Sequence, residues 1–192
     1  GYQIDDNGEI AGGDGIHCSI LYSNDETNIL GYGSAYAIND TRQVTGQNLF
    51  GNNESNDFIY RNGEMLDLGS LNGSFSTGYG INEFGQVTGA IFTSSDESYA
   101  FVYKDGVMSD LNTLIDPSSG WNLISGRGII NLGQICGYGI NPQGYEHAFL
   151  LTPIPEPATL LLLGLGGILL RKRSEKVKIV ESLHDRNFLR IP

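Results

Sequence analysis

A proline–glutamate–proline triplet near the C-terminus is the stretch with the clearest chemical consequence. It consists of Pro155, Glu156 and Pro157. Proline cannot continue a helix and restricts the residue before it to extended backbone, so the triplet should remain extended. We therefore expect it to be accessible to a separate enzyme and to serve as a recognition element rather than as a catalyst.

An unbroken apolar run follows the triplet and ends at a basic cluster. We expect a helix over residues 158–170, before Arg171, Lys172 and Arg173. A membrane span needs roughly 20 residues, so the run would cross a thin or locally thinned bilayer if counted from Ile154. The positive-inside rule makes the cluster cytoplasmic and places residues 1–153 outside. A buried core helix with a basic cap is the alternative, but the run has no polar face.

The order of triplet, apolar helix and basic cluster resembles the PEP-CTERM sorting signal, here residues 153–173. The resemblance implies that an exosortase, a membrane enzyme similar to cysteine peptidases, recognises the triplet and releases or transfers the exported protein. It implies transient anchoring in the inner membrane of a Gram-negative bacterium, then delivery to the cell surface or extracellular matrix. Signals of this family usually end near the basic cluster, whereas this chain continues through a basic and polar tail, 174–192.

Charge is divided unevenly along the chain. Residues 1–152 carry 18 acidic and 4 basic side chains, whereas residues 153–192 carry 4 acidic and 7 basic ones. An acidic body argues against nucleic acid or an anionic membrane surface as a partner. The 27 glycines and the many tyrosines and phenylalanines favour short strands joined by tight turns.

Export also requires an N-terminal signal peptide. The sequence starts at Gly1 without a charged and then apolar leader, and we expect a signal peptide, and perhaps further repeats, upstream.

Cys18 and Cys136 do not form a disulfide framework. In an oxidising compartment they would either pair or remain as free buried thiols.

Four copies of one pattern fill residues 1–152. The segment Ile-Asn-Glu-Phe-Gly-Gln-Val-Thr-Gly starts at Ile81 and recurs from Ile38 and Ile129, with a divergent copy from Ile4. Each copy is followed by a second strand-like segment; these are residues 18–22, 56–60, 99–103 and 147–151. The expected units cover residues 1–34, 35–77, 78–120 and 121–152.

Each unit should contain four short antiparallel strands. In the second unit we expect strands at 35–39, 43–46, 58–60 and 65–68, and the third unit repeats this order. Asn62-Gly63 and Asp105-Gly106 predict type I′ hairpin turns, which need positive φ at both residues. The expected fold is therefore all-β and propeller-like, with a single apolar helix after it. The four units would close a four-bladed ring or, because the first copy is short, form the end of a larger one. An open solenoid or a stacked sandwich is the rival.

The unit resembles the HAF repeat of extracellular bacterial proteins, whose pattern is Ile-Asn-x-x-Gly-Gln-Val-x-Gly, then His-Ala-Phe, then Gly-x-Met-x-Asp-Leu. The triplet is intact only at 147–149; the third copy has Tyr-Ala-Phe at 99–101 and the second Asn-Asp-Phe at 56–58. The resemblance covers about residues 2–152, and it does not establish any enzymatic activity.

No residues have the spacing of a catalytic, cofactor or metal site. His17, His147 and His184 lack neighbours at metal-ligand spacing, and no nucleophile elbow or phosphate loop is present. The acidic stretch 5–9 superficially suggests calcium but is better explained as a turn of the first repeat. Trp121 and the tyrosines would form either a sugar-stacking surface or, more simply, core packing.

These observations predict an exported, non-enzymatic surface or matrix protein. Its expected partners are an exosortase, the inner membrane during sorting, and an exopolysaccharide or a surface protein; nucleic acid is not expected. The alternative is an extracellular β-propeller hydrolase or lyase that acts on glycans.

Overall fold

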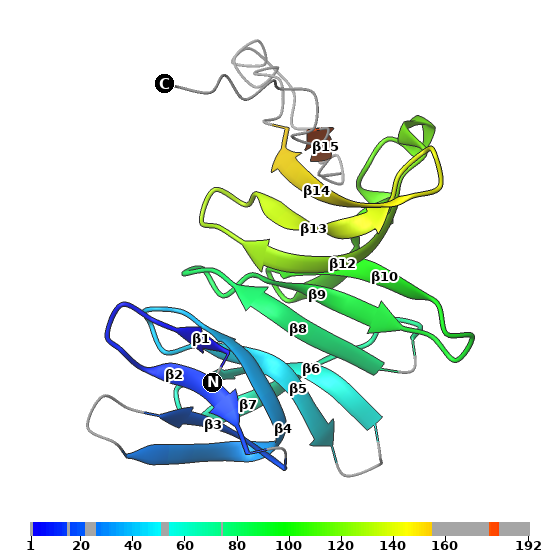
Figure 1. The fold of residues 1–192 in the computed structure, drawn as a ribbon. Coiled ribbons are helices and arrows are strands. Elements are labelled where there is room, and N and C mark those ends of the chain that lie inside the picture. Colours follow the sequence, from blue (N-terminus) through cyan, green and yellow to red (C-terminus); the bar gives the residue numbers. More distant parts are fainter. Residues whose placement is uncertain are drawn as a thin grey trace, which may run out of the picture.

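Stacked antiparallel sheets make up this computed structural model, which describes residues 2–14, 16–21, 26–50, 54–73, 75–154 and 177–180 (Figure 1). The first sheet contains β1 (Gln3–Ile4), β2 (Ile10–Gly13), β3 (His17–Leu21), β4 (Thr27–Ile38), β5 (Val44–Phe50), β6 (Glu54–Arg61) and β7 (Glu64–Gly69). The second contains β8 (Phe75–Ile81), β9 (Val87–Phe92), β10 (Ser98–Lys104) and β11 (Val107–Asp110). The third contains β12 (Asn122–Ile129), β13 (Ile135–Ile140), β14 (Glu146–Pro153) and β15 (Val177–Val180).

The two predicted type I′ turns are confirmed. Asn62 and Gly63 have φ of 53° and 84°, and Asp105 and Gly106 have 53° and 82°, as a type I′ turn requires. Among the described strands, every pairing is antiparallel and joins strands that are consecutive in the chain, including β14 and β15. Two short 3-10 helices, Leu111–Thr113 and Pro117–Ser119, join the second and third sheets. The described residues contain no α-helix, and the helix expected at 158–170 lies outside them.

The expected propeller is corrected: within the described residues the sheets stack in chain order and form no closed propeller or barrel. Figure 1 places β1–β3 at one end of the stack and β12–β15 at the other, so the terminal units do not meet.

The first two units also share one sheet. The 12-residue β4 pairs with β3 through residues 27–32 and with β5 through residues 33–38, because no turn interrupts it at the expected boundary after residue 34.

Each unit buries residues against the next, and we name its faces accordingly. Unit 1 is β1–β3, unit 2 is β5–β7 with residues 33–38, unit 3 is β8–β11, and unit 4 is β12–β14. The forward face of a unit is the one directed toward the next unit, and the rear face is the opposite one. Side chains alternate between these faces because a strand has a period of two residues.

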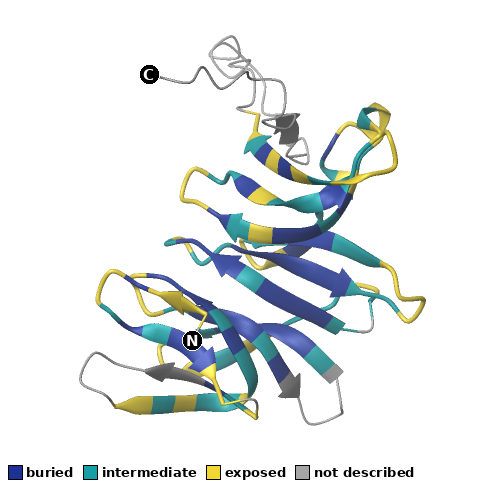
Figure 2. Cartoon of the chain, in the orientation of Figure 1, coloured by how far each residue is buried: buried dark blue, intermediate teal, exposed yellow. Residues whose placement is uncertain are grey.

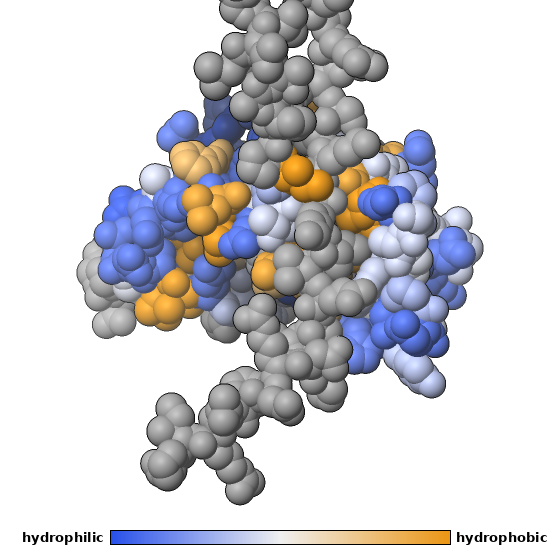
Figure 3. Space-filling model, turned by 90° about the horizontal axis from the view of Figure 1, so that it is seen from above, coloured by the Kyte–Doolittle hydropathy of each residue, from blue (hydrophilic) through white to orange (hydrophobic). Residues whose placement is uncertain are grey.

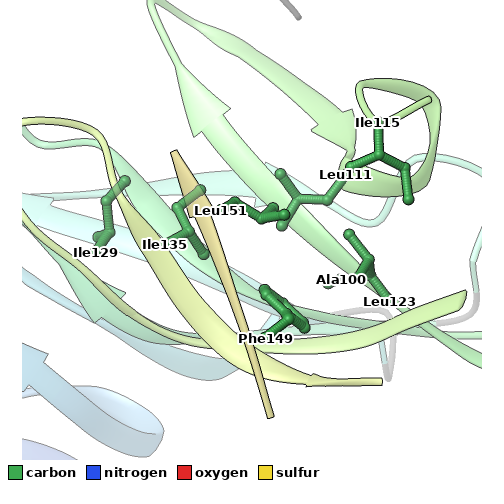
Figure 4. Packing of buried hydrophobic residues seen from close by; sticks show 8 residues of the cluster. All are labelled: Ala100, Leu111, Ile115, Leu123, Ile129, Ile135, Phe149 and Leu151. Atoms are coloured by element: carbon green, nitrogen blue, oxygen red, sulfur yellow. The ribbon is translucent and has the colours of Figure 1, made fainter. Parts of the chain in front are cut away.

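The hydrophobic core lies between the units rather than within one of them. One cluster joins Ala11 and Cys18 of unit 1 to Ile38 and Phe58 of unit 2. A second joins units 2 and 3, and a third joins Ala100 of unit 3 to unit 4. Figure 4 shows the third cluster, whose side chains converge between β10 and β12–β14. Figure 2 shows the same burial along the inner strands of the stack.

Hydrogen bonds at the repeated turns tie the units together edge to edge. Asn82 Oδ1 accepts the backbone N–H groups of Phe84 and Gln86, while its Nδ2 donates to the carbonyl of Ile130 in the next unit. Asn39 makes the same three kinds of bond, the last of them to the carbonyl of Asn82. The Asn of the repeat therefore closes its own turn and binds the following one.

The acidic stretch at residues 5–9 is a turn of this kind. Asp5 Oδ1 accepts the backbone N–H groups of Asn7 and Glu9, at 3.0 and 2.7 Å. Glu9 is buried and its carboxylate lies 2.6 Å from Arg42 Nη2 in the next unit. These carboxylates are engaged within the turns, which supports the turn interpretation over a calcium loop.

Candidate functional site

The sorting segment starts where the last sheet ends. Leu151 on β14 is fully buried, whereas Ile154, three residues later, is 47% exposed. The chain therefore leaves the core and reaches the surface immediately before the recognition triplet. Pro155, Glu156 and Pro157, and the basic cluster Arg171, Lys172 and Arg173, lie outside the described residues.

The chain after the sorting segment returns to the same sheet. β15 pairs antiparallel with β14, in a register that places Val177 opposite Pro153 and Val180 opposite Leu150. In this arrangement the two ends of the intervening segment lie next to each other at one sheet edge. Seen along the stack axis, the end near β15 carries hydrophobic patches among hydrophilic ones (Figure 3).

A row of aromatic side chains and one arginine crosses the units. It is formed by the residue two positions before the repeated isoleucine, and its members are Tyr2, Tyr36, Tyr79 and Arg127. In units 2, 3 and 4 this residue lies at a shift of strand register, as in a β-bulge. A bulge re-aims a side chain, so the same irregularity places Tyr36, Tyr79 and Arg127 beside one another.

Successive members of this row are in contact. The ring centroids of Tyr2 and Tyr36 are 4.9 Å apart, and those of Tyr36 and Tyr79 are 5.5 Å apart. The Arg127 guanidinium carbon lies 4.1 Å from the Tyr79 centroid and 5.3 Å from that of Tyr138. Tyr2 and Arg127 are exposed, and Tyr36, Tyr79 and Tyr138 are partly exposed. We call the four repeat residues, together with Tyr138, which contacts Arg127, the tyrosine–arginine row.

The row combines apolar faces with hydrogen-bonding groups. Burial raises the pKa of Tyr79, and the positive charge of Arg127 opposes that shift only in part, so the phenol stays protonated at neutral pH. Tyrosine faces suit stacking on the apolar faces of a ligand, and guanidinium groups suit carboxylates or phosphates. Such a surface can hold an extended ligand without any covalent chemistry.

Other candidates from the sequence have structural roles. Trp121 packs against the third core cluster, as the simpler interpretation predicted. His17 Nδ1 lies 3.0 Å from Asp14 Oδ2, and the described residues contain no group of three or more His, Cys, Asp or Glu that could hold a metal ion. Cys18 is buried, Cys136 is exposed and both are free thiols, so the disulfide alternative does not hold here.

A buried acid lies at the contact between units 2 and 3. Asp57 is fully buried on β6, and its Oδ1 accepts a 2.8 Å hydrogen bond from Thr45 Oγ1. Its Oδ2 has no protein hydrogen-bond partner. Burial raises the pKa of this carboxyl well above its ordinary value of 3.8, and the hydrogen bonds from Thr45 and the backbone oppose the shift only partly.

Stability should therefore depend on pH through Asp57. A raised pKa means that the folded state binds the proton more tightly, so this stabilisation is complete below about pH 3.8 and is lost as pH rises toward the folded pKa. Urea unfolding should show the free energy of unfolding falling by up to about 1.4 kcal/mol per pH unit in that range. Asp57→Asn should remove this dependence, and Asp96→Asn, at an exposed turn, should retain it. A wild-type slope that persists in Asp57→Asn would contradict the assignment.

Comparison with known proteins bears on the C-terminal segment alone. No helix among the described residues is long and apolar enough to cross a membrane. No curated protein and no solved structure shows significant similarity to the chain. Residues 153–174 match the model of the PEP-CTERM protein-sorting motif, which marks this chain as an exported exosortase substrate that is anchored transiently in the membrane before surface display.

Proposed function

We propose that residues 1–152 form a non-enzymatic binding module that the sorting motif delivers to the surface or extracellular matrix of a Gram-negative bacterium. The exosortase cuts near Pro155, Glu156 and Pro157, and residues 158–170 anchor the chain until then. The resemblance of the repeats to HAF repeats supports an extracellular role. The observation that carries the binding role is the tyrosine–arginine row.

An exopolysaccharide is the ligand that fits this row best. The row is extended, crosses all four units and offers partly exposed ring faces at separations of about 5 Å. Ring faces stack on the apolar faces of sugars, while Arg127 pairs with their acidic substituents. An acidic body would repel a polyanion elsewhere, so binding should be confined to the neighbourhood of this arginine.

Tyr79→Ala should weaken binding to the exopolysaccharide of the native host about tenfold. The loss of one stacked ring costs about 1 kcal/mol, and Arg127 also loses the ring beneath it. Affinity electrophoresis or calorimetry with the purified polysaccharide measures this change. Tyr145→Ala is the matched control, because Tyr145 is 67% exposed and lies outside the row. Equal affinity of both variants and the wild type would exclude the row as the binding surface.

Intact-mass measurement of the mature protein tests the sorting proposal. In protein recovered from the medium and envelope of the native host, we expect a C-terminus between residues 155 and 158. A mature chain that still contains residues 171–192 would mean that the C-terminal segment is an ordinary anchor.

A further inference from the structure

The third strand of every unit except the last is followed directly by a fourth strand that covers its outer edge. In units 2 and 3 these fourth strands are β7 and β11, which pair with β6 and β10. In unit 1 the first half of β4, residues 27–32, pairs with β3 in the same way. In unit 4 the third strand, β14, runs into the sorting motif instead.

β15 occupies the position of the missing fourth strand. It pairs antiparallel with β14 and places Ile179 opposite Leu151. In units 2 and 3, Met65 and Met108 lie opposite the residues equivalent to Leu151. An apolar residue therefore takes the same register position in all three strands, and β15 completes unit 4.

The sorting motif separates β15 from the rest of its unit. Residues 154–176 connect β14 to β15, whereas a type I′ turn makes the equivalent connection in units 2 and 3. The proposed cut near residues 155–157 falls within this connection, so it detaches β15. A membrane span also prevents the pairing, because it would place Pro153 and Val177 on opposite sides of the bilayer. The anchored chain and the released chain therefore both carry β14 as an uncovered edge strand.

The edge that β15 leaves is suited to accept another strand. Exposed edge strands are usually protected by bulges, prolines or charged side chains. β14 pairs with β13 over residues 146–151 without a shift of register, and residues 150–152 contain neither a proline nor a charge. Leu151 belongs to the third core cluster and is 0% exposed while β15 is in place. An uncovered β14 is therefore a template for main-chain pairing.

We propose that the uncovered edge of β14 in the sorted protein binds an extended, basic segment of a partner polypeptide, which supplies the fourth strand of unit 4. The segment runs antiparallel to β14 and presents an apolar residue opposite Leu151, as β15 does. A basic segment is favoured because residues 1–152 carry 18 acidic and only 4 basic side chains, and β15 itself contains Lys178. The site uses no residue of the tyrosine–arginine row, and it rests on the proposed function only because sorting removes β15.

A synthetic peptide of residues 174–183 tests the site on mature protein recovered from the native host. Along β14, successive backbone N–H groups point alternately toward β13 and toward the outer edge. Hydrogen exchange at the outer N–H groups of residues 150–152 should be fast in the mature chain and should slow about tenfold with saturating peptide. The N–H groups that face β13 should exchange slowly in both samples, which makes them an internal control.

Two variant peptides test the strand pairing and the charge. Because neighbouring N–H groups alternate, Lys178→Pro combined with Ile179→Pro removes one donor to β14, and this peptide should bind about tenfold more weakly. A peptide with Lys176→Glu and Lys178→Glu should bind about threefold more weakly at low salt. Equal binding of the proline peptide would contradict strand addition, and equal binding of the acidic peptide would contradict a basic partner.

Intact-mass measurement of the same sample reports the cut separately from strand binding. If the host yields only the uncleaved chain, its membrane-bound form has the same open edge and is assayed instead. Outer N–H groups that stay fast with saturating peptide would overturn the proposal. Slow exchange before peptide is added would overturn it as well, whether a second copy covers the edge, which sedimentation detects, or a retained tail fragment does, which the mass detects.

Discussion

Gly126→Ala should destabilise the protein by about 3 kcal/mol, the upper end of the cost of overpacking a core. A Cβ at Gly126 would overlap the Thr88 side chain, above all its hydroxyl, across the contact between units 3 and 4. Thr88 is fully buried and its Oγ1 donates a 2.8 Å hydrogen bond to the carbonyl of Phe101, so it cannot easily turn away. The strain would therefore fall on the interface between two sheets.

The chain itself suggests how this loss is rescued. The contact between units 1 and 2 offers a comparison. There, Ala35 of unit 2 is equivalent to Gly126, and Ala11 of unit 1 is equivalent to Thr88. An alanine on the later unit is therefore tolerated where the earlier unit presents an alanine. Thr88→Ala combined with Gly126→Ala recreates that pair, and the double variant should lie within about 1 kcal/mol of Thr88→Ala alone.

Urea unfolding of the wild type, both single variants and the double variant measures this coupling. We expect an interaction free energy of about 2 kcal/mol in the favourable direction, within the range found for residues in contact. Gly126→Ala that unfolds at the wild-type midpoint, or effects that simply add, would show that the two units do not pack through these residues.

Local structure was predictable where one short pattern decides it. Asn62-Gly63 and Asp105-Gly106 specify their turns because few other pairs tolerate positive φ at both positions. The repeated Asn predicts a turn within its own unit. Its hydrogen bond to a backbone carbonyl of the next unit could not be predicted, because it depends on how the units stack. The single strand β4 across the first two units was missed because nothing in the sequence at residues 31–34 distinguishes a continuous strand from a break.

The arrangement of the units was the least predictable feature. Alternation along a strand shows which residues share a face but not which unit covers that face, so an open stack and a closed propeller have the same pattern. The tyrosine–arginine row was detectable, since Tyr2, Tyr36 and Tyr79 each lie two residues before the repeated isoleucine of their own unit. The sequence indicated the burial of Asp57 only weakly, because its equivalents Ala100 and Ala148 are both apolar and yet Ala148 is exposed.

Replacing Pro155, Glu156 and Pro157 together by alanines should abolish release of the protein into the medium. Alanines would let the helix expected at residues 158–170 extend toward the sheet and would remove the proline-restricted backbone expected of the recognition element. Intact-mass analysis of envelope and medium should find only an uncleaved, envelope-bound chain that retains residues 171–192. Replacing Ser94, Ser95 and Asp96 in an exposed turn by alanines is the control and should leave processing unchanged.

The retained chain also has a structural signature. A helix of residues 158–170 that crosses the membrane holds its ends roughly 20 Å apart, at about 1.5 Å per residue. β15 pairs with β14 only when Pro153 and Val177 are neighbours, and a membrane span would place these two residues on opposite sides of the bilayer, so membrane insertion and this pairing exclude each other. Hydrogen exchange at residues 150–153 of the envelope-bound variant should therefore be fast on the edge that β15 otherwise covers. Slow exchange there would mean that the retained segment folds back onto the sheet instead of spanning the bilayer. Release of the alanine variant into the medium would mean that the triplet is not the recognition element.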